Sequence, residues 1–166
     1  MDAEQRLHRL SGVARVIYRH IDRQAAIHSG PLRVLVVPCP DIEIPLAWAR
    51  RSLNAGIEID YVLANVDSSE SVAARIAAVA DQGATIECLD LDFRRGPVPT
   101  GFDLVVSMYG MHPLREVEAF RRLQSLIFAS DGPIVDCDFA RSSTNYWLAR
   151  FACRMISRDP MARRST

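Results

Sequence analysis

Residues 32–47 are the segment best equipped for chemistry. Residues 32–37 are almost all apolar and predict a buried strand, and a helix is predicted to begin near residue 43. A nucleotide-type cofactor commonly binds a doubly wound α/β domain at such a strand–turn–helix junction, because strand-end amides and a helix N-terminus converge there. The turn carries Pro38 and Pro40 where glycines are expected. The sequence therefore combines a cofactor-binding scaffold with an altered cofactor loop.

Strands and helices alternate along the chain and must position that junction. Helical spacing of apolar residues predicts helices at 3–27, 43–54, 68–82, 114–128 and 145–157. Apolar runs between turn residues predict strands at 32–37, 57–65, 85–89, 102–108 and 134–138. This alternation predicts a Rossmann-like α/β domain, which is a doubly wound, mostly parallel five-stranded sheet with helices on both faces and strand order 3-2-1-4-5.

Composition excludes several classes of protein. Of the 166 residues, 49% are hydrophobic, which is too many for a disordered chain. Twenty basic residues balance twenty acidic ones, so no overall charge favours a nucleic acid or an anionic membrane. The four cysteines form no C-x-x-C pair, which argues against a zinc site and favours a reducing cytoplasm. We expect no signal peptide and no membrane span, because no apolar run approaches the ~20 residues that a span requires.

Three further segments extend the pattern of the cofactor junction. Residues 61–67 predict a second strand that ends in polar residues, and residues 87–93 read Glu-Cys-Leu-Asp-Leu-Asp-Phe. Residues 98–114 contain Pro-Thr-Gly-Phe-Asp-Leu-Val and continue to a histidine two residues before a leucine. In order and spacing, residues 30 to about 140 resemble the class I S-adenosylmethionine-dependent methyltransferases, which commonly show a "P-x-G-x-F-D-x-V" run and a downstream "H-x-L".

The resemblance implies S-adenosylmethionine as the cofactor and assigns it a set of binding positions. These positions are Pro38, Cys39, Pro40, Asn65, Asp92, Phe93 and Ser107. The carboxylate of Asp92 stands where the family accepts a hydrogen bond from the adenine amino group, and Asn65 stands where an acidic residue grips the ribose hydroxyls. Any ligand is expected at the carboxyl ends of the first, second and fourth strands.

Several of these positions depart from the family pattern in ways that weaken binding. Proline offers no amide N–H, whereas glycine allows close backbone approach to a ligand. Asn65 lacks the charge that strengthens a hydrogen bond to a ribose hydroxyl, and Val36 replaces an acidic residue near the end of the first strand. Because each lost hydrogen bond to a charged group costs roughly 1.5–3 kcal/mol, two such losses weaken affinity by about two to four decades.

The residues that could act chemically form no strong constellation. His112 is a weak candidate for a general base, since a histidine at this place is often structural and would need a substrate proton within reach. Ser107, Tyr109 and His112 lie close in sequence but lack the G-x-S-x-G of a hydrolase. Asp90 and Asp92 alone provide too few ligands for a specific metal site, so no metal is expected.

Three functions remain open at this stage. The first is a methyltransferase-like protein that has lost normal cofactor binding and serves as a regulatory or scaffolding partner. The second is an active methyltransferase acting on a small aromatic or quinone-like molecule, as the resemblance implies. The third is a small hydrolase or isomerase, for which the sequence offers no nucleophile motif.

The ends of the chain suggest how it is organised. We expect an N-terminal helix within 1–29, a methyltransferase-like α/β domain over 30–140, and a C-terminal helix and basic tail over 141–166. The family adds two more strands after the fifth, and none is predicted here. The fifth strand, 134–138, would then be an unpaired edge, so we expect the helix at 145–157 to pack back on the sheet and a homodimer or partner protein to dock on this side.

Overall fold

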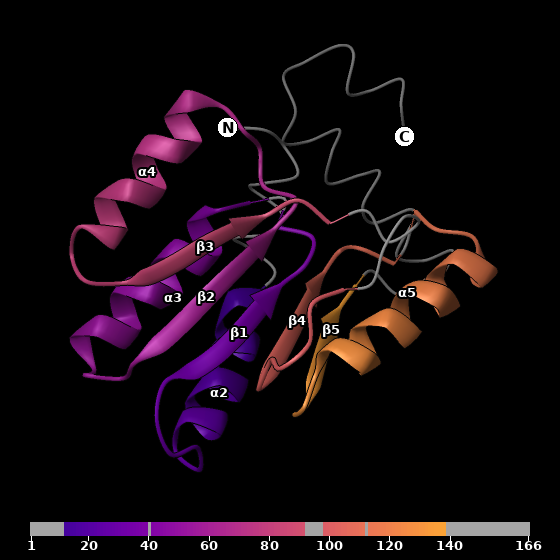
Figure 1. The fold of residues 1–166 in the computed structure, drawn as a ribbon, viewed down its shortest axis with the longest axis horizontal. Helices are drawn as coiled ribbons and strands as arrows, with labels where there is room; N and C mark the ends of the chain where they lie inside the picture. Colours follow the sequence, from indigo (N-terminus) through magenta and orange to yellow (C-terminus); the bar gives the residue numbers. More distant parts are fainter. Residues whose placement is uncertain (1–11, 40, 92–97, 112, 139–166) are drawn as a thin grey trace.

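The structure is a computed structural model, and it describes residues 12–39, 41–91, 98–111 and 113–138. Five strands form one sheet in the order β3-β2-β1-β4-β5 (Figure 1), and every neighbouring pair runs parallel. The strands are β1 Leu32–Val36, β2 Ile59–Ala64, β3 Thr85–Leu89, β4 Leu104–Met108 and β5 Ile134–Cys137. The sequence-based strand order is therefore confirmed.

Helices cover the two faces of the sheet unequally. The described helices are α2 Val13–Ala25, α3 Glu43–Asn54, α4 Glu70–Ala80 and α5 Glu116–Ala129. Buried side chains of α2, α3 and α4 pack in one apolar cluster with alternate residues of β1, β2 and β4, whereas Leu126 and Ala129 of α5 pack with residues of the opposite face. Figure 1 shows this arrangement, with α5 apart from the other three helices.

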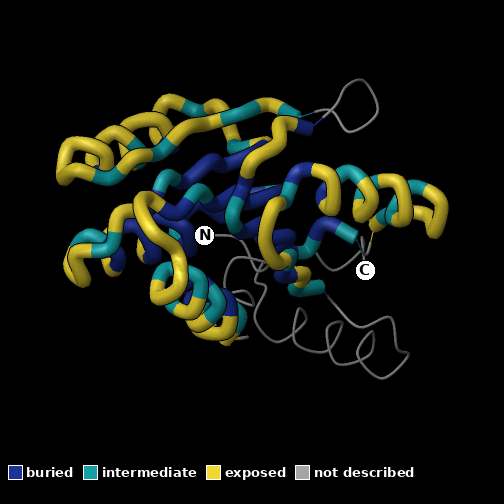
Figure 2. Tube along the Cα trace, turned by 60° about the horizontal axis from the view of Figure 1, so that its bottom comes forward, coloured by how far each residue is buried: buried dark blue, intermediate teal, exposed yellow. Residues whose placement is uncertain are grey.

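Burial across the sheet follows the expected pattern. All five residues of β4 and four of the five in β1 are buried, as the continuous apolar runs predict for strands covered on both faces. The outer strand β3 has no buried residue and β5 has one. Figure 2 shows the buried trace concentrated in the central strands and the exposed trace on the helices.

Two strands begin later than predicted, because residues before them form hydrogen bonds with the ends of helices instead of with a neighbouring strand. The second strand begins at Ile59 rather than at 57, because the amide of Ile57 donates to the Ser52 carbonyl, 2.9 Å away, at the end of α3. The fourth strand begins at Leu104 rather than at 102, because Phe102 pairs with the chain at the end of α5. The predicted helix at 145–157 lies outside the described residues. Of the helices that the structure describes, none combines the length and the apolar character that a bilayer span requires.

Candidate functional site

The carboxyl ends of β1 and β4 form the switch point of the sheet. The chain leaves β1 for β2 on one side and reaches β4 on the other, so the loops after these strands diverge and leave space for a ligand in folds of this type. Two residues that follow β2 and β4 have positive φ angles, 57° at Asn65 and 55° at Tyr109. Such backbone conformations are uncommon for residues other than glycine and cluster at functional sites.

The turn after β1 is bonded to the neighbouring strands rather than open. The amide of Val37 donates to the Val106 carbonyl at 2.8 Å, and the amide of Cys39 donates to the Ala64 carbonyl at 2.9 Å. Pro38, between them, has no amide to donate. The described part of this turn therefore directs its N–H groups into the sheet, where a glycine-rich loop would direct some toward a ligand.

The ring of Pro38 lies against the loop that follows β4. A Cβ atom at position 110 would come within 2.6 Å of Pro38 Cδ, so Gly110 is needed for this close approach. The Gly110 carbonyl accepts a hydrogen bond from Arg122 Nη1 of α5 at 3.0 Å. The loops after β1 and β4 are thus in contact across the switch point.

Asn65 ties the end of β2 to the chain that follows β3. Its Nδ2 donates to the Leu91 carbonyl at 3.1 Å, and its Oδ1 accepts from the Leu91 amide at 2.7 Å. The backbone amide of Asn65 also donates to the Leu89 carbonyl at 2.8 Å. We call the paired hydrogen bonds between Asn65 and Leu91 the Asn65 clasp. An acidic side chain could not form it, because a carboxylate cannot donate to the Leu91 carbonyl.

Cys39 and Asp41 lie in the same turn and are both buried. Burial raises the pKa of the Cys39 thiol from 9.0 to about 12, with smaller contributions from Asp41 and Cys88, so the thiol is protonated and unreactive at neutral pH. Asp41 Oδ1 accepts from the Glu43 amide at 2.9 Å, which satisfies a free donor at the start of α3. Asp41 Oδ2 is buried without a hydrogen-bond partner among the described residues.

Ser107 occupies the centre of the sheet near the end of β4. It is fully buried, and its Oγ has no hydrogen-bond partner in the part of the chain that the structure describes. Strand alternation places its side chain on the same face as Val105, which is the face that α5 covers. Buried polar atoms in proteins nearly always have a partner, so this hydroxyl marks a place that water or a ligand could satisfy.

The sequence did not identify Asp138, whose carboxylate holds the loop after β4. Asp138 Oδ2 accepts a hydrogen bond from the Met111 amide at 2.6 Å. Burial lowers the pKa of the Arg122 guanidinium, and Asp136 and Asp138 oppose that shift. Arg122 could have been identified from the sequence as a residue of this region. It lies four residues before the buried Leu126 and therefore on the same face of α5.

Four predicted site residues lie outside the described residues. They are Pro40, Asp92, Phe93 and His112. The other four predicted residues, Pro38, Cys39, Asn65 and Ser107, lie toward the carboxyl edge of the sheet. Within the described ranges, no group of three or more His, Cys, Asp or Glu side chains is arranged to hold a metal ion.

A cavity of about 520 Å³ opens beside the Asn65 clasp, between α4 and β3. Its lining includes Asn65, Asp67, Cys88 and Asp90 together with apolar residues of α4. It does not reach Pro38, Cys39 or Ser107, so the predicted site residues do not share this cavity.

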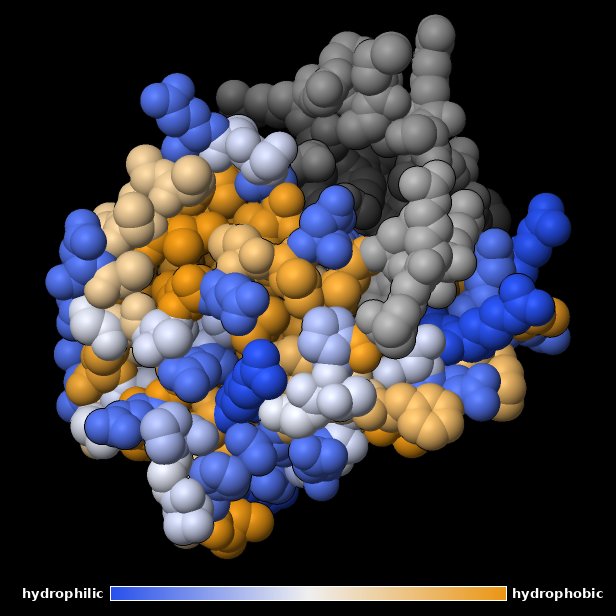
Figure 3. Space-filling view, in the orientation of Figure 1, coloured by the Kyte–Doolittle hydropathy of each residue, from blue (hydrophilic) through white to orange (hydrophobic). Residues whose placement is uncertain are grey.

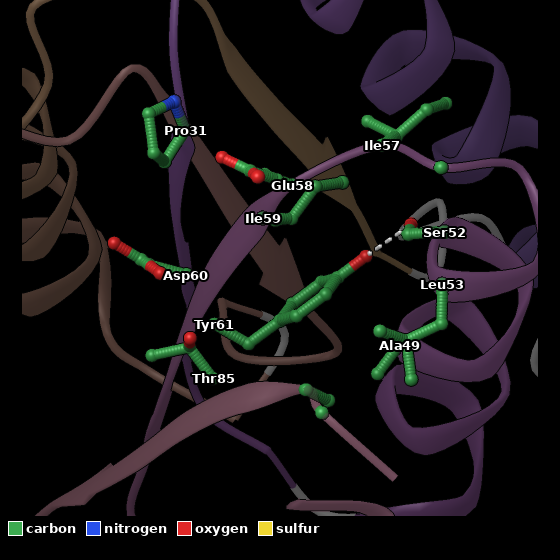
Figure 4. Close-up of a pocket in the computed structure, with 13 residues that line it drawn as sticks. Pro31, Ala49, Ser52, Leu53, Ile57, Glu58, Ile59, Asp60, Tyr61 and Thr85 are labelled. Atoms are coloured by element: carbon green, nitrogen blue, oxygen red, sulfur yellow. Dashed lines mark hydrogen bonds between the residues drawn. The ribbon is translucent and has the colours of Figure 1, made fainter.

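A second cavity, of about 440 Å³, lies at the opposite, amino edge of the sheet. Figure 4 shows Tyr61 pointing from β2 toward α3, where its hydroxyl is 3.2 Å from Ser52 Oγ, while Glu58 and Asp60 project on the other side of the strand. Burial raises the pKa of the Tyr61 phenol above its ordinary value of 10.0, so the phenol is neutral. These side chains do not converge on one point, and the Ser52–Tyr61 bond serves to join α3 to β2.

Several solved structures with the same fold are methyltransferases, and some of them are named as S-adenosylmethionine-dependent. A candidate O-methyltransferase from Nostoc punctiforme matches with a TM-score of 0.58 and 18% identity, over 97% of this chain and 43% of that chain. The DszA carbon methyltransferase matches with a TM-score of 0.60 and 14% identity, over 87% and 38% of the two chains. A candidate S-adenosylmethionine-dependent methyltransferase from Methanococcus maripaludis matches with a TM-score of 0.56 and 14% identity, over 87% and 64%.

These likenesses confirm that the chain has the fold of class I S-adenosylmethionine-dependent methyltransferases, as the sequence predicted. The chain spans between 38% and 64% of the length of these three proteins. Neither a protein-family model nor a curated protein sequence matches the chain.

Proposed function

We propose that this protein is methyltransferase-like but binds S-adenosylmethionine weakly or not at all, and that it acts as a regulatory or scaffolding partner of another protein. The Asn65 clasp is the observation that carries this proposal. The residue at the ribose-binding position of the family uses one N–H and one lone pair of its carboxamide on the Leu91 backbone, which fixes the orientation of the side chain.

The turn after β1 supports the same proposal. Pro38 provides no N–H, the Cys39 amide donates to Ala64, and the Pro38 ring fills the approach to Gly110. The described residues therefore do not fit the cofactor in the way that a glycine-rich loop does. With each lost hydrogen bond to a charged group costing roughly 1.5–3 kcal/mol, the dissociation constant should lie well above ~100 µM.

An active methyltransferase acting on a small aromatic or quinone-like substrate is the second candidate. Two buried polar atoms at the carboxyl edge favour it, Ser107 Oγ and Asp41 Oδ2, which lack partners among the described residues. A buried polar group without a partner costs about 1–3 kcal/mol, and a bound ligand could remove that cost. His112 is the weak candidate for its general base, and Asp92 and Phe93 would contact its cofactor.

Calorimetric titration with S-adenosylmethionine, and with S-adenosylhomocysteine as a second ligand, separates the two candidates. The first predicts no saturable heat below ~100 µM ligand. Low-micromolar binding, together with transfer of a labelled methyl group to a phenol or a quinol, would support the second candidate and contradict the first. The cytoplasmic location and the division at residues 29 and 140 remain predictions.

A further inference from the structure

The helix α5 carries apolar side chains on two opposite faces. Leu126 and Ala129 are buried against the sheet. On the other side, five large apolar side chains lie in solvent with exposed fractions of 40% to 71%. These residues, which we call the outer stripe, are Val117, Phe120, Leu123, Ile127 and Phe128. Contiguous exposed apolar patches commonly mark sites at which another protein docks, so the outer stripe is a candidate docking face.

The outer stripe is large enough to form the centre of an interface. Taking full areas near those of large apolar side chains, the five residues expose on the order of 500 Å². A standard protein–protein interface buries about 800 Å² per partner, of which the centre is apolar and the rim polar. Figure 3 shows apolar side chains at the surface on the α5 side of the molecule, with charged side chains around them.

The spacing of the outer stripe is nearly symmetric about Leu123. Phe120 lies three residues before Leu123 and Ile127 four residues after it. Val117 lies six residues before it and Phe128 five residues after it. Two copies of α5 packed antiparallel across a two-fold axis at Leu123 would therefore place apolar residues opposite apolar residues along the whole helix.

We infer that the outer stripe of α5 binds a second copy of this chain in an antiparallel, two-fold arrangement centred on Leu123. Symmetric spacing is a property that a self-complementary interface needs and that an unrelated partner would not require. This inference does not depend on whether the protein binds S-adenosylmethionine.

Sedimentation and light scattering of the full chain over about 1 to 100 µM, a range that spans ordinary interface affinities, test the inference. The expected result is a concentration-dependent dimer of twice 18.5 kDa. Ile127→Asp should weaken the dimer at least about tenfold, since it buries an unpaired charge. Ile27→Asp is the matched control, because Ile27 is 78% exposed and lies outside α5. It should leave the dimer unchanged.

A wild-type protein that stays monomeric would overturn the inference, as would a dimer indifferent to Ile127→Asp. If the wild type is monomeric and Ile127→Asp alone lowers its unfolding midpoint, the inference is also wrong, because the chain itself then covers the stripe.

Discussion

The carboxyl edge of the sheet and the outer stripe of α5 differ in how many of their potential binding groups already have partners within the protein. At the edge, the Asn65 side chain and the Cys39 amide are bonded to the protein's own backbone, whereas Ser107 Oγ and Asp41 Oδ2 have no partner among the described residues. On α5, large apolar side chains remain in solvent. The chain has the methyltransferase fold, and we propose that its partner binds at a helix face rather than at the cofactor edge.

Substitution at the contact between the loops after β1 and β4 should have the largest effect. Gly110→Ala brings a Cβ within 2.6 Å of Pro38 Cδ, and overpacking of this kind costs about 1–3 kcal/mol of unfolding free energy. Urea unfolding measures the change. In a Pro38→Gly background the clash is gone, so Gly110→Ala should cost much less. An equal cost in both backgrounds would show that the two loops are not in contact.

The Cys39 thiol should make the protein sensitive to alkali. Its pKa is raised from 9.0 to about 12 in the folded state, so its stabilising contribution is complete below pH 9 and is lost as the pH rises toward 12. At pH 10.5 the loss is about 2 kcal/mol relative to neutral pH, by linkage.

The Cys39→Ala variant serves to isolate that contribution. Between pH 8 and pH 10.5, it should lose less unfolding free energy than the wild type by about the same 2 kcal/mol. Parallel pH profiles for the two proteins would mean that the thiol ionises freely in the folded state.

Breaking the Asn65 clasp should have an intermediate effect. Asn65→Asp removes the donor to the Leu91 carbonyl and sets a carboxylate against it, which should cost about 1–2 kcal/mol. Asn54→Asp, at the exposed end of α3, is the matched control and should cost less than about 0.5 kcal/mol. Chemical denaturation measures the loss of unfolding free energy in the two variants. Equal losses would show that the clasp does not stabilise the fold.

Polar substitution on the outer stripe should have the smallest effect on the folded monomer. Phe120 is 68% exposed, so Phe120→Gln should change the unfolding free energy by less than about 0.5 kcal/mol in dilute solution. Thermal and urea unfolding at protein concentrations below the dimer range measure it. A loss of several kcal/mol would place Phe120 inside the monomer core and contradict its description as a docking residue.

The fold was largely predictable because its signals are local. Alternating apolar runs and helical stripes gave all five strands and their order, and Thr85–Leu89 and Glu43–Asn54 match the predicted bounds. The site was less predictable because its contacts are not local. The sequence identified Asn65 as a departure from the family, but its bonds to Leu91 join residues 26 positions apart. The outer stripe of α5 was also missed, because apolar spacing alone cannot tell which face of a helix the sheet covers.

Titration of the wild-type protein with S-adenosylmethionine tests the central claim most directly. We expect no saturable binding below ~100 µM, because Asn65 is held by the Leu91 backbone without a carboxylate charge and the turn after β1 directs its amides into the sheet. Low-micromolar affinity with normal stoichiometry would contradict it and show that the cofactor binds despite Pro38 and the clasp.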